Sequence, residues 1–274
     1  MAQLQPYCAI EGNDDGLPVV FVHGMGVDHR SLMMLDKAFD GNDSIRRIYL
    51  DLPGFGRTPA LPEHACGLPE IADWLQTAID GLVGKAAPFA MVGNSMGGAL
   101  VREVLAREPR RVAGMALIAP VVDPQHAGRH VAEHVVAQPN PKLTHSLPQD
   151  QVFDFVTMGV NQSFDAWRRY QRFILPGVAL CDRAACERLG QRYWLADNPE
   201  EMLGGSGAHR HRQARPDRRI RRSASPVAAL SQRHLRDAGQ CRSQRAHRPT
   251  RSRHHARTRM GGSYGVRSVE LTVC

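Results

Sequence analysis

The sequence predicts an α/β fold with a doubly wound, mostly parallel sheet, and three observations lead to it. The first is length, because 274 residues allow one large α/β domain with an insertion. The second is the alternation of short apolar runs, typical of buried parallel strands, with amphipathic stretches of helical spacing. The apolar runs cover residues 17–24, 46–51, 88–92 and 111–120. The amphipathic stretches cover residues 32–39, 69–83 and 99–107. The third is a sharp, glycine-rich turn between the run at 88–92 and the helical stretch after it. Strands that alternate with helices in this way favour a parallel sheet with helices on both faces.

The first predicted strand, residues 17–24, is rich in β-branched residues and ends in His23-Gly24. A loop starting at Met25 then leads into the helical pattern of residues 32–39. His23 is open to two interpretations, a catalytic residue or a structural histidine that braces the loop, and we favour the second.

The second predicted strand, residues 46–51, runs into a loop at 52–58 whose proline and two glycines indicate a tight turn. The next stretch, residues 69–83, is amphipathic, with apolar side chains at the spacing of one helix face. These side chains are Ile71, Trp74, Leu75, Ala78, Ile79 and Leu82. The sequence therefore predicts a helix here that packs one face on the sheet.

The turn after residues 88–92 has the pattern Gly-x-Ser-x-Gly, with Ser95 at its centre. Between a strand and a helix, this pattern predicts a strained turn that exposes the serine hydroxyl, and small residues two before and two after allow close contact. The amide of Met96 would then lie at the helix N-terminus, where a developing oxyanion is stabilised. The alternative is an incidental serine in a glycine-rich turn, which the strand and helix on either side disfavour.

The run of residues 111–120 predicts another buried strand, ending in Ala-Pro. The order of a His-Gly loop, Asp-x-Pro-Gly-x-Gly-x-Thr, Gly-x-Ser-x-Gly-Gly and a strand ending Ala-Pro resembles the α/β-hydrolase superfamily over residues 17–122. The resemblance implies that Ser95 is the nucleophile of a serine hydrolase and that the amides of Met25 and Met96 form its oxyanion hole. Both amides should then lie about 3 Å from one point near the Ser95 Oγ. It implies hydrolysis of a small ester or amide through an acyl-enzyme, with no metal and no cofactor.

Three segments divide the chain: a hydrolase-like core at 1–122, a helical cap at 123–203 and an arginine-rich tail at 204–274. In the family, an insertion after this strand is a helical cap over the nucleophile. Its apolar side chains, such as Met158, Trp167 and Phe173, either line an apolar substrate pocket or only pack the cap. Residue by residue, we favour packing.

The acid and the histidine that a serine nucleophile needs should follow in the order Ser, Asp or Glu, His. The sequence of residues 204–274 has no Val/Ile/Leu-rich run, no Gly-x-x-Asp pattern and no Gly-His near the end that could supply them. Asp123 is a weak candidate for the acid, since some family members place it there, but a turn or helix-capping role is favoured. The remaining histidines, His247, His254 and His255, lie in an arginine-rich stretch without a strand to hold them.

A shift of reading frame explains this absence. Read from the second base of each codon, residues 206–220 permit Pro-Val-Leu-Ile-Val-Thr-Gly-Arg-His-Asp-Pro-Thr-Val-Gly-Tyr, a buried strand and the family's acid loop. Residues 233–244 permit Ala-Thr-Phe-Val-Thr-Leu-Asp-Ser-Ala-Gly-His-Asn, the last strand and its histidine loop.

Several positions in this frame are tightly constrained, although many allow four residues. His209, His211 and His234 each become only Ile or Thr, and Gln213 only Lys or Arg. The Asp and His codons lie 28 codons apart, a separation normal for the family. We therefore expect that the frame was shifted shortly before residue 206.

The net charge of +8 divides unevenly along the chain. Residues 208–274 hold 17 Arg, no Lys and 3 acidic residues, a net charge of +14, whereas residues 1–207 carry −6. A basic tail would favour nucleic acid or an anionic surface. The lack of Lys and of interleaved aromatic residues makes nucleic acid an unlikely partner. The composition predicts disorder. The alternative function is a catalytically dead product whose basic tail binds nucleic acid or anionic surfaces.

Cysteine usage and hydropathy predict a cytoplasmic protein, and the hydrolase resemblance implies a small-molecule substrate. The six cysteines are scattered without metal-ligand spacing, and Cys181/Cys186 is not a Cys-x-x-Cys pair, so reduced thiols are expected. No apolar run is long enough to span a membrane, and the first residues lack a signal-peptide pattern. The sequence indicates neither the substrate nor the oligomeric state.

Overall fold

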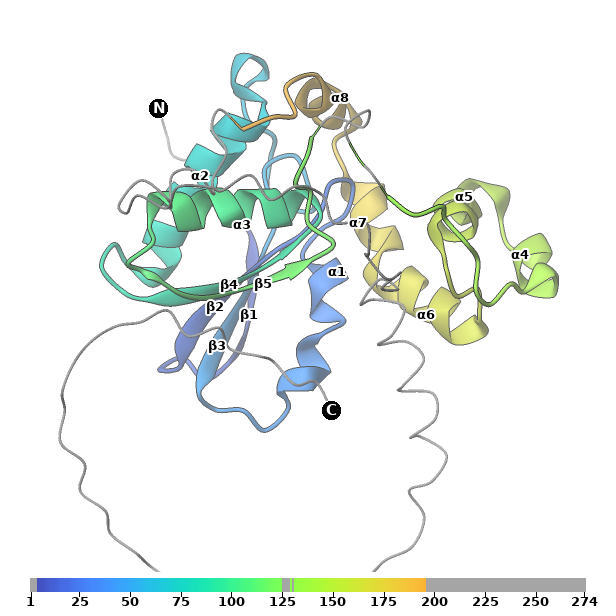
Figure 1. The fold of residues 1–274 in the computed structure, drawn as a ribbon, viewed down its shortest axis with the longest axis horizontal. Helices are drawn as coiled ribbons and strands as arrows, with labels where there is room; N and C mark the ends of the chain where they lie inside the picture. Colours follow the sequence, from blue (N-terminus) through green and yellow to red (C-terminus); the bar gives the residue numbers. More distant parts are fainter. Residues whose placement is uncertain (1–3, 125–128, 130, 196–274) are drawn as a thin grey trace, which may run out of the picture. The chain divides into compact units, whose positions relative to one another are not determined.

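The structure, a computed structural model, describes residues 4–124, 129 and 131–195, and its centre is a five-stranded sheet (Figure 1). The strands are β1 (Cys8–Gly12), β2 (Leu17–Val22), β3 (Ile45–Leu50), β4 (Phe89–Asn94) and β5 (Val112–Ile118). Their order in the sheet is β1-β3-β2-β4-β5, with β1 antiparallel to β3 and the other pairs parallel. The mostly parallel sheet that the sequence predicts is confirmed.

The central strands of the sheet are buried on both faces. The helices α2 (Leu68–Val83) and α3 (Met96–Arg107) lie on one face and the short α1 (Arg30–Met33) on the other (Figure 1). Along β2, Val20 and Val22 join the apolar cluster under α2 and α3, whereas Val19 and Phe21 join the cluster that includes Leu32 of α1. This period of two is that of a strand covered on both faces, so the doubly wound arrangement is also confirmed.

The continuous helix predicted over residues 32–39 is wrong. The chain forms α1 and then a separate 3₁₀ turn, Asp36–Phe39. The Asp36 carboxylate accepts hydrogen bonds from the Arg47 Nε at 2.7 Å and the Tyr49 hydroxyl at 2.9 Å. Because both donors lie on β3, these hydrogen bonds fix Asp36 against the sheet, and the chain begins a separate turn there instead of continuing α1.

The regular elements between β5 and residue 195 are helices in the part that the structure describes. They are α4 (Pro141–Ser146), α5 (Gln149–Met158), α6 (Phe164–Phe173), α7 (Leu175–Leu180) and α8 (Arg183–Gln191). Leu143, Phe155 and Trp167 form a small apolar cluster of their own. The corner before α8 is tied to the core, since the Asp182 amide donates to the Gly54 carbonyl at 2.9 Å.

Membrane-spanning helices are absent from the described ranges, where every helix is too short or too polar to cross a bilayer. The predicted disorder and frame shift of residues 204–274 lie outside the described residues. That residues 123–203 form a cap over the nucleophile remains a prediction.

Candidate active site

Ser95 occupies a strained turn between β4 and α3. Its backbone has φ 51° and ψ −116°, a conformation that a non-glycine residue adopts only when its surroundings enforce it. Strand β5 and the residues after it enforce it here. The Ser95 amide donates to the Ile118 carbonyl at 3.0 Å, and the Ser95 carbonyl accepts from the Val121 amide at 3.0 Å. Backbone hydrogen bonds to the end of β5 and the residues after it therefore keep Ser95 in this strained conformation.

The glycines around Ser95 are required by close backbone contact. A Cβ added at Gly97 would lie 2.1 Å from the Val22 carbonyl oxygen, and one added at Gly93 would lie 2.6 Å from the Gly97 carbonyl oxygen. The first turn of α3 is thus pressed against the end of β2. The Gly-x-Ser-x-Gly spacing is what allows the helix to start directly behind the serine.

Substituting Gly97→Ala should lower the free energy of unfolding by about 3 kcal/mol, because the new methyl group meets backbone that cannot move aside. Gly81→Ala is the matched control, since a Cβ on this exposed residue of α2 meets nothing within 4 Å. It should leave stability unchanged or raise it by up to about 1 kcal/mol. Urea midpoints of the two variants measure the difference, and equal midpoints would contradict the close contact.

The loop after β2 lies beside Ser95. A Cβ built on Gly24 would be 3.2 Å from the Ser95 Cβ and 3.1 Å from the Asn94 Oδ1. His23 braces this loop, because its Nδ1 donates to the Gly24 carbonyl at 2.7 Å and its Nε2 accepts from the Leu52 amide at 3.0 Å. Complete burial lowers the pKa of His23, which favours the neutral ring that this bonding needs. The structural role favoured from the sequence is confirmed.

A pocket of about 350 Å³ opens beside Ser95. Its wall combines the loop after β2, helix α1, the ends of β4 and β5, and the residue before α7. The lining residues are Gly24, Met25, Val27, Ser31, Leu32, Met34, Leu35, Asn94, Ser95, Ile118 and Ile174. The two expected oxyanion donors are placed near this pocket, Met25 in its wall and Met96 directly after Ser95 as the first residue of α3.

In the described part of the chain, the Ser95 side chain has no histidine or carboxylate as a hydrogen-bond partner. Asp123, the weak candidate for the acid, is half-buried beyond β5, and its carbonyl accepts from the Arg129 Nε at 2.7 Å. The other candidates, His247, His254 and His255, lie outside the described residues, as do the codons expected to encode the acid and base.

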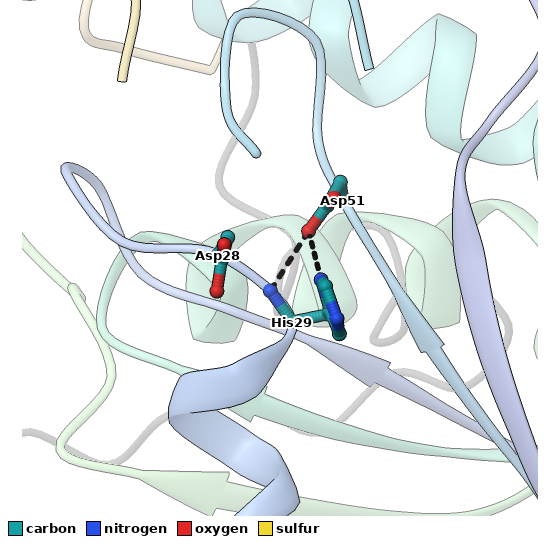
Figure 2. A group of neighbouring side chains, drawn as sticks. All are labelled: Asp28, His29 and Asp51. Carbon is teal, nitrogen blue, oxygen red and sulfur yellow. Dashed lines mark hydrogen bonds and ion pairs between the residues drawn. The ribbon is translucent and has the colours of Figure 1, made fainter. Parts of the chain in front are cut away.

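A buried cluster of Asp28, His29 and Asp51, missed from the sequence, joins the loops after β2 and β3 (Figure 2). The Asp51 Oδ1 accepts from the His29 Nδ1 at 2.7 Å and from the His29 amide at 2.8 Å, and its Oδ2 accepts from the Arg57 amide at 2.9 Å. The Asp28 carboxylate accepts from the Arg30 side chain at 2.6 Å and the Arg30 amide at 3.0 Å.

The three side chains each offer a potential metal-ligand atom, and these atoms lie within 4.8 Å of one another. Every carboxylate oxygen of the cluster already has an N–H donor, however, and the Asp28 charge is paired with Arg30. This donor set fits a brace between two loops better than a metal centre. The signal in the sequence was that both loops follow neighbouring parallel strands and so meet at one edge of the sheet.

The Asp51 brace predicts a pH dependence. Burial raises the pKa of the Asp51 carboxyl, but hydrogen bonds from the His29 ring and from the Arg57 and His29 amides outweigh it and hold the pKa below its ordinary value of 3.8. A group whose pKa is lower in the folded state than in the unfolded state adds to the free energy of unfolding at any pH above its unfolded pKa. This contribution is lost as the pH falls through the folded-state pKa. Asp51→Asn should therefore cost about 2 kcal/mol at pH 7, and the difference from the parent should shrink below pH 3.8.

Asp14→Asn is the control for this effect, because the Asp14 side chain is exposed and lies 3.7 Å from the Arg46 Nε. It should change stability little at any pH. Urea unfolding of both variants from pH 7 to pH 3 measures the effect, and a loss in Asp51→Asn that stays constant over this range would contradict the assigned pKa direction.

Comparisons with known proteins find similarity to a family model and to a solved hydrolase structure. The model of a family described as alpha/beta hydrolase fold matches residues 18–141. A crystal structure of an alpha/beta superfamily hydrolase from Oenococcus oeni PSU-1 is similar, with a TM-score of 0.64 and 26% identity over 73% of this chain and 72% of that one.

Two curated proteins match a shorter stretch. The dihydrolipoyllysine-residue acetyltransferase component of an acetoin cleaving system from Pseudomonas putida is 34% identical over 108 residues, covering 39% of this chain. A putative non-heme haloperoxidase of Mycobacterium phage D29 is 35% identical over 113 residues, covering 40% of this chain. The matched stretches span 28% and 38% of the length of those two proteins.

Proposed function

Since the chain belongs to the α/β-hydrolase fold superfamily, we propose that it is a serine hydrolase that cleaves a small ester or amide through an acyl-enzyme at Ser95. The observation that carries this proposal is the strained backbone of Ser95 in the wall of a pocket. Strain of this kind is kept where a side chain must be presented to a ligand.

The proposed chemistry has two steps. The Ser95 Oγ attacks the carbonyl carbon and loses its proton to a base, and the leaving group departs with a proton to give the acyl-enzyme. Water then attacks the acyl carbon and releases Ser95. In both steps the amides of Met25 and Met96 would donate to the oxyanion. The Met96 amide, at the start of α3, has no acceptor within its own helix and lies at the positive end of the helix dipole.

The base and its orienting acid are proposed to come from the restored reading frame. The Asp codon straddles Arg215 and Pro216, and the His codon straddles Ser243 and Gln244. This assignment follows the chain order Ser, Asp, His of the family. Hydrolysis by the chain as written is then impaired, since an unassisted serine hydroxyl is a weak nucleophile.

The pocket supports a small substrate with an apolar group. Its volume of about 350 Å³ is near the lower end for ligand pockets, and most of its lining side chains are aliphatic or Met. The predicted cap contributes Ile174 to this wall. Trp167 packs instead with Phe155 in a separate cluster, and the Met158 side chain is exposed. A specificity role for residues 123–203 thus rests on Ile174 rather than on these side chains.

Hydrolysis of p-nitrophenyl esters and matched anilides of increasing chain length by the frame-restored protein tests the proposal. Ile174→Ala should change the preference between short and longer acyl groups by about tenfold, because it enlarges the pocket wall. Met158→Ala, at a position 74% exposed, is the control and should leave the preference unchanged. Failure of the restored protein to cleave any of these substrates would contradict the proposed function.

A further inference from the structure

Two cysteines meet at the corner between α7 and α8. Cys181 directly follows α7, Cys186 lies in α8, and their Sγ atoms are 2.7 Å apart. Both side chains are half-buried against the main apolar cluster. The corner is held in shape by the Asp182 side chain, which caps α8 through the Ala185 amide at 3.0 Å, and by the Asp182 carbonyl, which accepts from the Cys186 amide at 2.9 Å. The fold therefore places two free thiols in direct contact.

Cys181 of this pair is accessible to a small molecule. Cys181 and Arg183 line a pocket of about 420 Å³, together with Asp154 and Tyr170 from α5 and α6. Cys66, by contrast, is a buried single thiol whose Sγ donates to the Ala185 carbonyl at 3.6 Å. Cys8 is half-buried and also free. Among the described cysteines, only Cys181 combines a partner thiol with an open approach from a pocket.

We propose that Cys181 and Cys186 are a redox-active dithiol, which a low-molecular-weight disulfide such as oxidised glutathione converts to an intramolecular disulfide. The Cys181 thiolate attacks the small disulfide, forms a mixed disulfide and releases one small thiolate. Cys186 then loses its proton and attacks the Cys181 sulfur, forming the Cys181–Cys186 bond and releasing the second small thiolate. The protein loses two electrons and two protons, and the small disulfide is reduced to two thiols.

The order of attack follows from the local electrostatics. The hydrogen bond with Cys186 lowers the pKa of the Cys181 thiol, whereas the same bond raises the pKa of Cys186. Cys181 is thus the group that reaches the thiolate form first, and it is also the one that faces the pocket.

The disulfide would fix the junction of two helices that contact the core at different places. In α7, a Cβ on Gly177 would lie 2.6 Å from the Asp28 amide nitrogen, and Ile174 before it lines the Ser95 pocket. On the other side of the junction, the Asp182 amide is bound to the Gly54 carbonyl. Oxidation would cross-link these two attachments through a loop of residues 181–186.

The test uses the full chain in glutathione redox buffers, followed by alkylation, trypsin and mass spectrometry. Cleavage after arginine separates the two cysteines into peptides 173–183 and 184–188. In oxidised buffer these peptides should be recovered joined by a disulfide, and in reduced buffer each should be alkylated. Because Cys66 is only 3% exposed in the folded chain, its slow alkylation identifies the folded fraction, and the result is read from that fraction.

Variants separate the two thiols. Cys186→Ser should accumulate the mixed glutathione disulfide at Cys181, because the resolving thiol is gone, and Cys181→Ser should react at least about tenfold more slowly at Cys186. Cys8→Ser is the matched control and should leave the joined peptide unchanged. In urea, the equilibrium constant for forming the Cys181–Cys186 disulfide from oxidised glutathione should be at least about tenfold smaller than in the folded chain. Separate glutathione adducts on both residues, or an equal equilibrium constant in urea, would overturn the proposal.

Discussion

Correcting the reading frame by one base just upstream of codon 206 should raise ester turnover by about a million-fold over the chain as written. The increase is expected because the corrected frame permits the acid and the histidine, without which a serine beside an oxyanion hole would keep only a small part of triad catalysis. Initial rates of the two proteins on one p-nitrophenyl ester measure the effect. Robust hydrolysis by the uncorrected chain would show that the frame interpretation is mistaken.

The same correction should raise solubility. In the described part of the chain β5 is an edge strand, and its Met115 and Leu117 side chains are 38% and 36% exposed. An open edge with apolar side chains favours association with other chains, and the strands that the restored frame permits would cover it. Limited proteolysis checks this account: the written chain should give a resistant core ending near residue 203, and a resistant core that reaches residue 274 would contradict it.

Replacing Ser95→Ala in the frame-restored protein should lower turnover by about a million-fold, because no other group can form the acyl-enzyme. The fold should be unaffected, since the hydroxyl has no hydrogen-bond partner among the described residues and Ala retains the Cβ. Ser31→Ala is the control: this serine lines the same pocket but its hydroxyl donates to the Asp28 carbonyl at 2.7 Å, so turnover should fall far less. An equal loss in both variants would mean that Ser95 is not the nucleophile.

The central part of the fold could be predicted from the sequence because local pattern and tertiary environment agree there. In β2 and β4 both faces are buried, so nearly every residue is apolar. The glycine spacing around Ser95 is needed for close backbone contacts such as that of Gly97 with Val22. The Gly-x-Ser-x-Gly pattern predicted Ser95 and Met96, and the family resemblance implied Met25; the structure places Ser95 and Met25 in the wall of one pocket.

Other features depend on contacts that a sequence pattern does not contain. The break after α1 depends on Asp36 reaching Arg47 and Tyr49 on β3, and the apolar spacing of residues 32–39 gave no sign of it. The strand β1 was missed because it is a short edge strand with mostly exposed side chains. The contact of Cys181 with Cys186 arises only when a helix corner brings them together.

Labelling of the frame-restored protein with a serine-directed phosphonate tests the central claim, that Ser95 is the nucleophile, most directly. The phosphonate reacts only with a serine that a base activates, so one adduct per chain is expected, on the tryptic peptide that contains Ser95. Ser95→Ala should abolish the adduct. An ester substrate that is hydrolysed slowly should delay labelling while it is present, because it occupies Ser95. An adduct on any other residue, or full labelling of Ser95→Ala, would contradict the account.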